Sequence, residues 1–217
     1  MVKSAVGPTG RVVVLLFDDI DSVFEKPYRN GLFGGLRTII DQKAFSPAIR
    51  NVKFGFAHSH DPSHWIKDSN QSPFNVAKPF IVPEFEEKQI AWLNEQHGHC
   101  LSSTEVTELF QLLGGHPYLS RVALYYLARR EITVAKLKVE AATDQGLFGD
   151  HLRSRLLSVF QAGLHTPLKE ILDAGRCARE LDFQSLLAMG LINGANHSNA
   201  SARFGLYREY FQGKLDA

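Results

Sequence analysis

Two adjacent aspartates, Asp18 and Asp19, are the residues of this sequence best suited to chemistry with a metal ion. They directly follow Val13–Phe17, a run of aliphatic and aromatic residues, and this is the Walker B pattern. The run predicts a strand that is buried on both faces of a parallel sheet. At the end of such a strand Asp18 would hold the water shell of Mg²⁺, and Asp19 would orient a water molecule that attacks a phosphate. The simpler alternative is a buried strand that ends in two turn-forming aspartates.

A second group of residues, His58, His60 and His64, has the spacing of metal ligands. In an extended chain the pattern H-x-H places two imidazoles on one side, and here a third follows four residues later. The hydrolase pattern H-x-H-x-D-H is not matched, because Asp61 immediately follows the second histidine. A metal-dependent hydrolase that uses these histidines is therefore the least favoured of three hypotheses for the function of this chain.

The elements that must position these residues begin with two apolar runs, at residues 11–17 and 52–57. Aliphatic residues at helical spacing lie between the two runs, namely Leu32, Leu36, Ile39 and Ile40. Strand, helix and strand within about 45 residues predict a parallel βαβ unit. We expect a third, short strand at residues 80–82, which would complete a first region at residues 1–85.

The rest of the chain predicts two further regions, at residues 86–162 and 163–217. The first of these is helical: Ser102 and Glu105 have the spacing of a capping box, and Pro117 suits the first turn of another helix. The last region has helices at about residues 166–174 and 183–189. A hairpin with its turn at Asn193-Gly194 and a final helix follow, which is the outline of a winged-helix module.

Composition limits the class of protein. The chain has 217 residues, and 24 Lys+Arg against 23 Asp+Glu give a formal net charge of +1. A near-neutral charge argues against a protein that mainly binds nucleic acid non-specifically. The apolar runs are far shorter than the roughly 20 residues that span a bilayer, and Cys100 and Cys177 form no CxxC pair. We therefore expect a globular protein of a reducing, cytoplasmic compartment.

Five segments, in order, resemble the AAA-like ATPases common in cyanobacteria, which belong with the STAND signalling NTPases. The first is LLFDDIDSVFE at residues 15–25, which is similar to the Walker B segment of that family. The others are NQSPFNV (70–76), GGHPYL (114–119), LAMGL (187–191) and LYREYF (206–211). The resemblance runs from about residue 11 to residue 215, whereas residues 1–10 do not resemble the family and read as a leader or a scar.

The resemblance implies a P-loop NTPase core with parallel strands, an α-helical lid and a winged-helix domain, and it implies binding of ATP or ADP with Mg²⁺. It assigns Mg²⁺ to Asp18 and the attacking water to Asp19. Ser59 or His58 would then lie near the γ-phosphate. In the lid it places Pro117 against the adenine, with Gly114 and Gly115 of the same motif as further nucleotide-binding residues. Arg121 lies four residues after Pro117 on the same helix face and would reach a phosphate; the alternative is an ordinary surface arginine.

Two features depart from the family pattern. No GxxxxGK[ST] motif occurs in the sequence, and the glycine-rich stretch at residues 31–38 has no lysine and reads as the start of a helix. Many AAA proteins also have Glu where this chain has Asp19, and the shorter side chain implies slow turnover. We therefore expect the carboxyl-terminal part of a family member, inactive as an ATPase when alone. Its partner would be the missing P-loop half or an effector domain, and a homo-oligomer is compatible with the resemblance.

The main alternative is a winged-helix module that binds DNA or a protein and is carried on a degenerate ATPase scaffold. Direct readout of the major groove depends on basic and amide side chains. Residues 183–189, the expected recognition helix, contain no Lys or Arg. A DNA partner is for this reason not favoured, and a nucleotide-dependent signalling switch remains the leading hypothesis.

Overall fold

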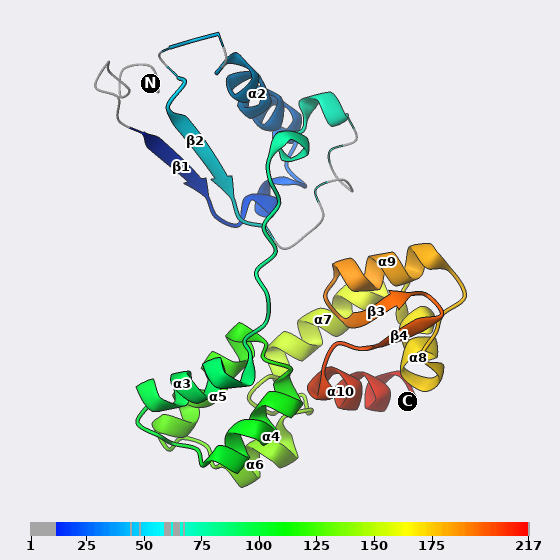
Figure 1. Cartoon of the computed structure of the whole chain (residues 1–217). Coiled ribbons are helices and arrows are strands. Elements are labelled where there is room, and N and C mark those ends of the chain that lie inside the picture. The colour runs from blue at the N-terminus through cyan, green and yellow to red at the C-terminus, as the bar shows by residue number, and fades with distance from the viewer. Residues whose placement is uncertain are drawn as a thin grey trace. The chain divides into compact units, whose positions relative to one another are not determined.

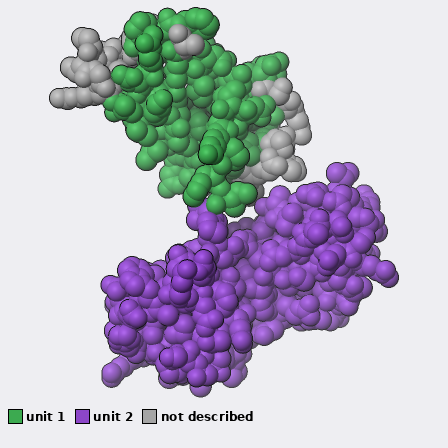
Figure 2. Space-filling view, viewed as in Figure 1, with its two compact units in different colours: residues 1–81 green, residues 82–217 purple. Residues whose placement is uncertain are grey.

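The computed structural model describes residues 12–43, 45–47, 49–58, 62, 66 and 68–216. The chain divides into two compact units, Met1–Ile81 and Val82–Ala217, shown in different colours in Figure 2. The α/β composition predicted from the sequence is confirmed: a parallel pair of strands lies in the first unit, and helices dominate the second (Figure 1).

The first unit is built on two parallel strands, β1 (Val13–Phe17) and β2 (Val52–Phe56). Residues pair in register from Val13 with Val52 to Phe17 with Phe56. Parallel strands require a crossover connection, and α2 (Arg29–Gln42) supplies it, so the predicted βαβ unit is confirmed. The glycine-rich stretch at residues 31–38 lies inside this helix. Short 3-10 helices among the described residues of the unit include η1 (Ile20–Val23), η3 (Ser69–Gln71) and η4 (Phe74–Val76).

One face of the β1–β2 pair packs on an aromatic core. The rings of Phe17 and Phe56 stack with centroids 5.5 Å apart, and Phe74 approaches Phe56 at 5.3 Å. Phe24 and Phe33, which are 1% and 0% exposed, complete the core beneath α2. Aromatic burial of this kind stabilises the unit through both apolar area and favourable ring geometry.

The opposite face of β1 is open, which corrects the expectation of a strand buried on both faces. Val14 and Leu16 are 56% and 78% exposed, and burial alternates along the strand. Leu16 lies against Gly55, where an added Cβ would come within 2.7 Å of a leucine methyl group. An apolar run therefore predicts a strand, but it does not predict whether other residues cover both faces of that strand.

The third strand expected at residues 80–82 is also wrong for the described structure. Phe80, Ile81 and Val82 are 85%, 88% and 72% exposed, and within the described residues they pair with no strand. A strand needs a neighbour for its backbone hydrogen bonds, and β1 and β2 pair only with one another in the part of the chain that is described. Residues 80–82 therefore have the composition of a strand but no pairing strand among the described residues.

The second unit contains eight helices among the described residues. They are α3 (Glu87–Gln96), α4 (Ser103–Leu113), α5 (Pro117–Ala128), α6 (Val134–Glu140), α7 (Gly149–Gln161), α8 (His165–Ala174), α9 (Glu180–Ala188) and α10 (Gly205–Leu215). The capping box predicted at Ser102 is confirmed, because its backbone N–H donates to Glu105 at 2.8 Å and its hydroxyl accepts from the Glu105 amide. Pro117 occupies the first turn of α5, as predicted.

A hairpin of β3 (Ile192–Asn196) and β4 (Asn199–Ala202) lies among α8, α9 and α10 (Figure 1). The turn predicted at Asn193-Gly194 is wrong, because these residues lie within β3 and the chain reverses at His197-Ser198. Gly194 lies at an irregularity of the ladder, where a Cβ would come within 2.2 Å of the Asn199 carbonyl oxygen. Glycine is thus required here by the close approach of β4.

The second unit has one continuous apolar core. It extends from Ile90 on α3 through Leu124 on α5 to Phe211 on α10, so the regions expected at 86–162 and 163–217 pack together. The parallel pair of the first unit contributes a separate, smaller core. In the part of the chain that the structure describes, no helix is both long and apolar enough to cross a membrane.

Candidate functional site

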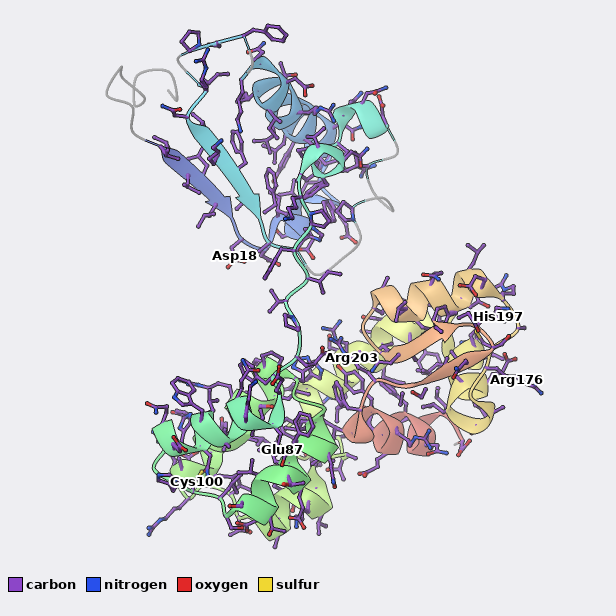
Figure 3. All side chains as sticks on the ribbon, in the orientation of Figure 1. Asp18, Glu87, Cys100, Arg176, His197 and Arg203 are labelled. Carbon is purple, nitrogen blue, oxygen red and sulfur yellow. The ribbon has the colours of Figure 1, made fainter. Side chains whose placement is uncertain are left out.

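Asp18, which Figure 3 labels, and Asp19 lie at the carboxyl edge of β1, and both residues are exposed. Asp19 adopts a left-handed backbone conformation, with φ of 52°, and its amide donates to Asp18 Oδ1 at 3.0 Å. Aspartate tolerates this conformation better than most residues. The turn is fixed because the Ile20 amide donates to the Ala57 carbonyl at 3.1 Å. Two carboxylates are therefore presented to solvent at one strand end.

His58 lies at the same edge, because β1 and β2 are parallel and their carboxyl ends coincide. Its imidazole is exposed and meets the ring of Phe74 edge-on at 5.2 Å. The structure thus brings His58 and the two aspartates to one edge of the sheet. Ser59, the other candidate at this position, lies outside the described residues.

The metal-site alternative depends on His60 and His64, which also lie outside the described residues. Among the residues that are described, no group of three His, Cys, Asp or Glu side chains could hold a metal ion. The polar residues at 97–100 form a turn after α3, in which Gly98 and His99 have positive φ.

In the second unit, Gly114 and Gly115 form the junction between α4 and α5. Gly114 ends α4 in the left-handed conformation, with φ of 58°. Gly115 has φ of 74°, and a Cβ there would lie 2.0 Å from the carbonyl oxygen of Phe85. The Phe85 amide in turn donates to the Gly115 carbonyl at 2.8 Å. Glycine is required at this position both by its conformation and by the neighbouring chain.

Pro117 follows directly and starts α5, while His116 caps the helix through Nδ1, which accepts from the Leu119 amide at 3.4 Å. Arg121 is exposed and lies one turn later. Together with burial, its positive charge lowers the pKa of His97 at the end of α3. The structure therefore brings Arg121 near His97, and it places Gly114, Gly115 and Pro117 at the junction of α4 and α5.

Sequence reasoning missed a cluster of side chains around His116. The ring of His151 lies 5.6 Å from that of His116, and its Nε2 is 2.7 Å from the hydroxyl of Tyr207. Arg203, after the hairpin, donates to Glu84 from Nε at 2.6 Å and to the Gly190 carbonyl from Nη1 at 3.1 Å. Figure 3 labels Arg203, which connects the segment before α3 to the hairpin end.

The family model of the AAA-like domain matches residues 6–213. The chain belongs to the AAA-like domain family. The match starts before residue 11, so residues 6–10 are part of the family region, contrary to the expectation that residues 1–10 lie outside it. In the same comparisons, no curated protein and no solved structure matched the chain.

The AAA-like family points in general to nucleotide and Mg²⁺ use, and the edge of β1 suits the metal ion. Magnesium is held in proteins by one or two carboxylates together with water and phosphate oxygens. Asp18 is exposed, and one of its carboxylate oxygens accepts a hydrogen bond from the Asp19 amide. The residues present at this edge therefore fit a Mg²⁺ ion.

Electrostatics of the His116 cluster in this AAA-like chain favour neutral histidines. Burial lowers the pKa of His116, and the positive charges of Arg203 and Arg155 lower it further. Burial, Arg155 and His116 lower the pKa of His151 from 6.5 to about 4. Burial also raises the pKa of the Tyr207 hydroxyl. His116 and Tyr207 fall in segments that resemble the family, whereas Glu84, His151 and Arg203 do not. Glu84 and Arg203 are 119 residues apart in sequence, so spacing gave no signal for their pairing.

Proposed function

We propose that the chain supplies the Walker B, lid and winged-helix parts of an ATP-binding cytoplasmic signalling switch of the STAND class. The observation that carries the proposal is the pair of exposed carboxylates at the carboxyl edge of a parallel strand, in a chain of the AAA-like family. Asp18 would hold Mg²⁺ and Asp19 would orient the attacking water, with His58 or Ser59 near the γ-phosphate. Mg²⁺ bound there would neutralise charge that develops on the phosphates.

The lid contribution in this proposal is adenine recognition by Pro117. A proline ring presents apolar surface without an N–H, and the close contact between Gly115 and Phe85 fixes where helix α5 begins. Arg121 remains a candidate for a phosphate contact only if it leaves the neighbourhood of His97. The surface-arginine alternative fits its position better.

A P-loop is needed to cradle the phosphates, and none occurs in these 217 residues. We propose that a P-loop-bearing segment, from the same or another polypeptide, adds to the β1–β2 sheet. The open face of β1, with Leu16 78% exposed, supports this proposal. So does the strand-like segment at residues 80–82, which pairs with no strand among the described residues. Strands that lack a covering layer or a neighbour are the expected result of removing part of an α/β sheet.

Regulation would follow from exchange of ADP for ATP. The lid and the winged-helix portion share one core, and Arg203 and Gly115 hold the segment that enters α3. Nucleotide exchange would thus act on the second unit as one body. The short Asp19 side chain would keep hydrolysis slow and so prolong the ATP-bound state.

Binding of a fluorescent ATP analogue tests this proposal, with the chain extended through a P-loop-bearing segment. Asp18→Asn should remove the Mg²⁺-dependent part of the affinity, whereas Glu25→Gln, an exposed acid of the same unit, should leave it unchanged. If Mg²⁺ changed the affinity of the unmodified chain, of Asp18→Asn and of Glu25→Gln equally, the role of Asp18 would be contradicted.

The alternative is a winged-helix module, and one observation favours a protein over DNA as its binding partner. Helix α9 carries no Lys or Arg, while Leu181 and Leu187 are 76% and 37% exposed. Arg179 before α9 pairs with Asp182 at 2.7 Å, and Arg203 pairs with Glu84. Sequence-selective duplex binding near physiological salt that is lost in Arg208→Ala would instead support a DNA-binding role.

A further inference from the structure

A groove of about 370 Å³ lies between α4, α6 and α10 in the second unit, on residues that the nucleotide proposal does not use. Its volume is at the lower end of the range of ligand pockets, about 300–1,000 Å³. The apolar residues that line it are Leu101, Leu109, Leu112, Leu127, Val134 and Leu137. A lining of this kind suits aliphatic side chains.

The rim of the groove is acidic. Glu105, Glu108 and Glu209 line it, and Lys138 is the one cation among its described lining residues. Lys138 already forms an ion pair with Glu108, and Glu105 accepts hydrogen bonds from Ser102 that lower its pKa. Glu209 is exposed and forms no ion pair with any residue that the structure describes. The rim therefore carries two uncompensated negative charges around an apolar floor.

The walls of the groove are held in place by local structure. The capping box of Ser102 and Glu105 fixes the start of α4. Gly205 lets α10 begin close to α4, since a Cβ there would lie 3.2 Å from the Gln111 carbonyl oxygen. Leu137 and Leu109 are only 2% and 5% exposed, so the floor belongs to the core. A preformed groove loses little conformational entropy when it binds a partner.

We propose that this groove binds a basic amphipathic helix of a partner protein. Helix-in-groove recognition uses apolar side chains at i, i+3 or i+4 and i+7, which here would enter the aliphatic floor. Lysines or arginines that flank those positions would meet Glu209 and Glu105 at the rim. The negative rim repels nucleic acid and anionic lipid, so charge complementarity selects a basic polypeptide. This inference is independent of nucleotide binding.

Fluorescence anisotropy with a synthetic probe tests the proposal on the whole chain. The probe is a labelled peptide of about 15 residues that contains only leucine and lysine, with the leucines at helical spacing. Its matched control has glutamate in place of every lysine. We expect saturable binding of the lysine peptide that weakens as salt is added, and no binding of the glutamate peptide.

Two charge reversals of equal size locate the binding site. Glu209→Lys should raise the dissociation constant of the lysine peptide about five- to tenfold. Glu25→Lys changes the net charge equally but lies in the first unit, and it should leave the dissociation constant within about twofold. Leu112→Gln, checked by circular dichroism for an intact fold, should weaken binding through the floor.

Three outcomes would overturn the proposal. One is equal binding of the two peptides, and another is an equal effect of the two charge reversals. The third is self-association of the chain in sedimentation that Glu209→Lys abolishes, because the groove would then be an interface between copies of this chain.

Discussion

The first unit leaves much of its sheet uncovered, whereas the second encloses its core. Leu16 on β1 is 78% exposed, while Leu113, Leu119 and Leu124 in the second unit are each fully buried. Strand β1 and the helices α4 and α5, which carry these leucines, are all rich in apolar residues. Composition therefore does not explain the difference in exposure. The second unit supplies its own covering helices, and the first lacks a second layer on one face of β1 within the described residues. The second unit therefore buries its apolar residues with its own helices, whereas the first leaves apolar side chains of β1 in solvent.

The largest expected effect contrasts the two faces of the first unit. Phe33→Ala removes a fully buried ring and should cost about 3–5 kcal/mol of the unit's unfolding free energy. Leu16→Ala on the open face should cost less than about 0.5 kcal/mol. Hydrogen exchange of the β1 and β2 amides during urea titration measures both. A cost above about 2 kcal/mol for Leu16→Ala would show that the open face is covered in solution.

In the second unit, the α4–α5 junction should tolerate change least. Gly115→Val adds a Cβ that would overlap the Phe85 carbonyl oxygen, at a residue with positive φ, and should cost about 3 kcal/mol or more. Gly98→Val is the matched control, since φ there is also positive but no atom lies within 4 Å. It should cost about 1–2 kcal/mol. Urea unfolding followed by circular dichroism compares them, and equal losses would contradict the tight approach of Phe85.

Acid should weaken the second unit through His151. Its pKa is about 4 when folded and 6.5 as the ordinary value, so the unfolded chain binds more protons between these values. Stability is therefore present above about pH 6.5 and is lost as pH falls toward about 4. Allowing for partial exposure, the loss should be about 1–2 kcal/mol. His151→Gln should flatten this part of the stability profile, and an unchanged slope would assign it to other groups.

A smaller effect is expected at Pro117. In the chain extended through a P-loop-bearing segment, Pro117→Ala should weaken binding of a fluorescent ATP analogue by about 1 kcal/mol, because apolar contact with the adenine is lost. Circular dichroism should show an unchanged fold. If affinity is also unchanged, the proline serves only as a helix start.

Features set by local sequence were predictable, and those set by absent or distant neighbours were not. The capping box at Ser102, the helix start at Pro117 and the βαβ unit are confirmed because each depends on nearby residues. Asn193-Gly194 has the composition of a turn, but the close approach of Asn199 placed it within β3. The Arg203–Glu84 pair joins residues 119 positions apart, which no spacing rule detects. The open face of β1 was missed because an apolar run does not reveal whether its cover is present.

The proposal that the chain needs a separate phosphate cradle is tested most directly by phosphate release from ATP, measured on the purified chain alone with Mg²⁺. No GxxxxGK[ST] motif occurs in the sequence, and in the proposed function the phosphate cradle comes from another segment, so we predict no release above background. Asp18→Asn should make no difference to this result. Release at rates typical of AAA enzymes, abolished by Asp18→Asn, would show that the first unit is complete as an ATPase and would contradict the account.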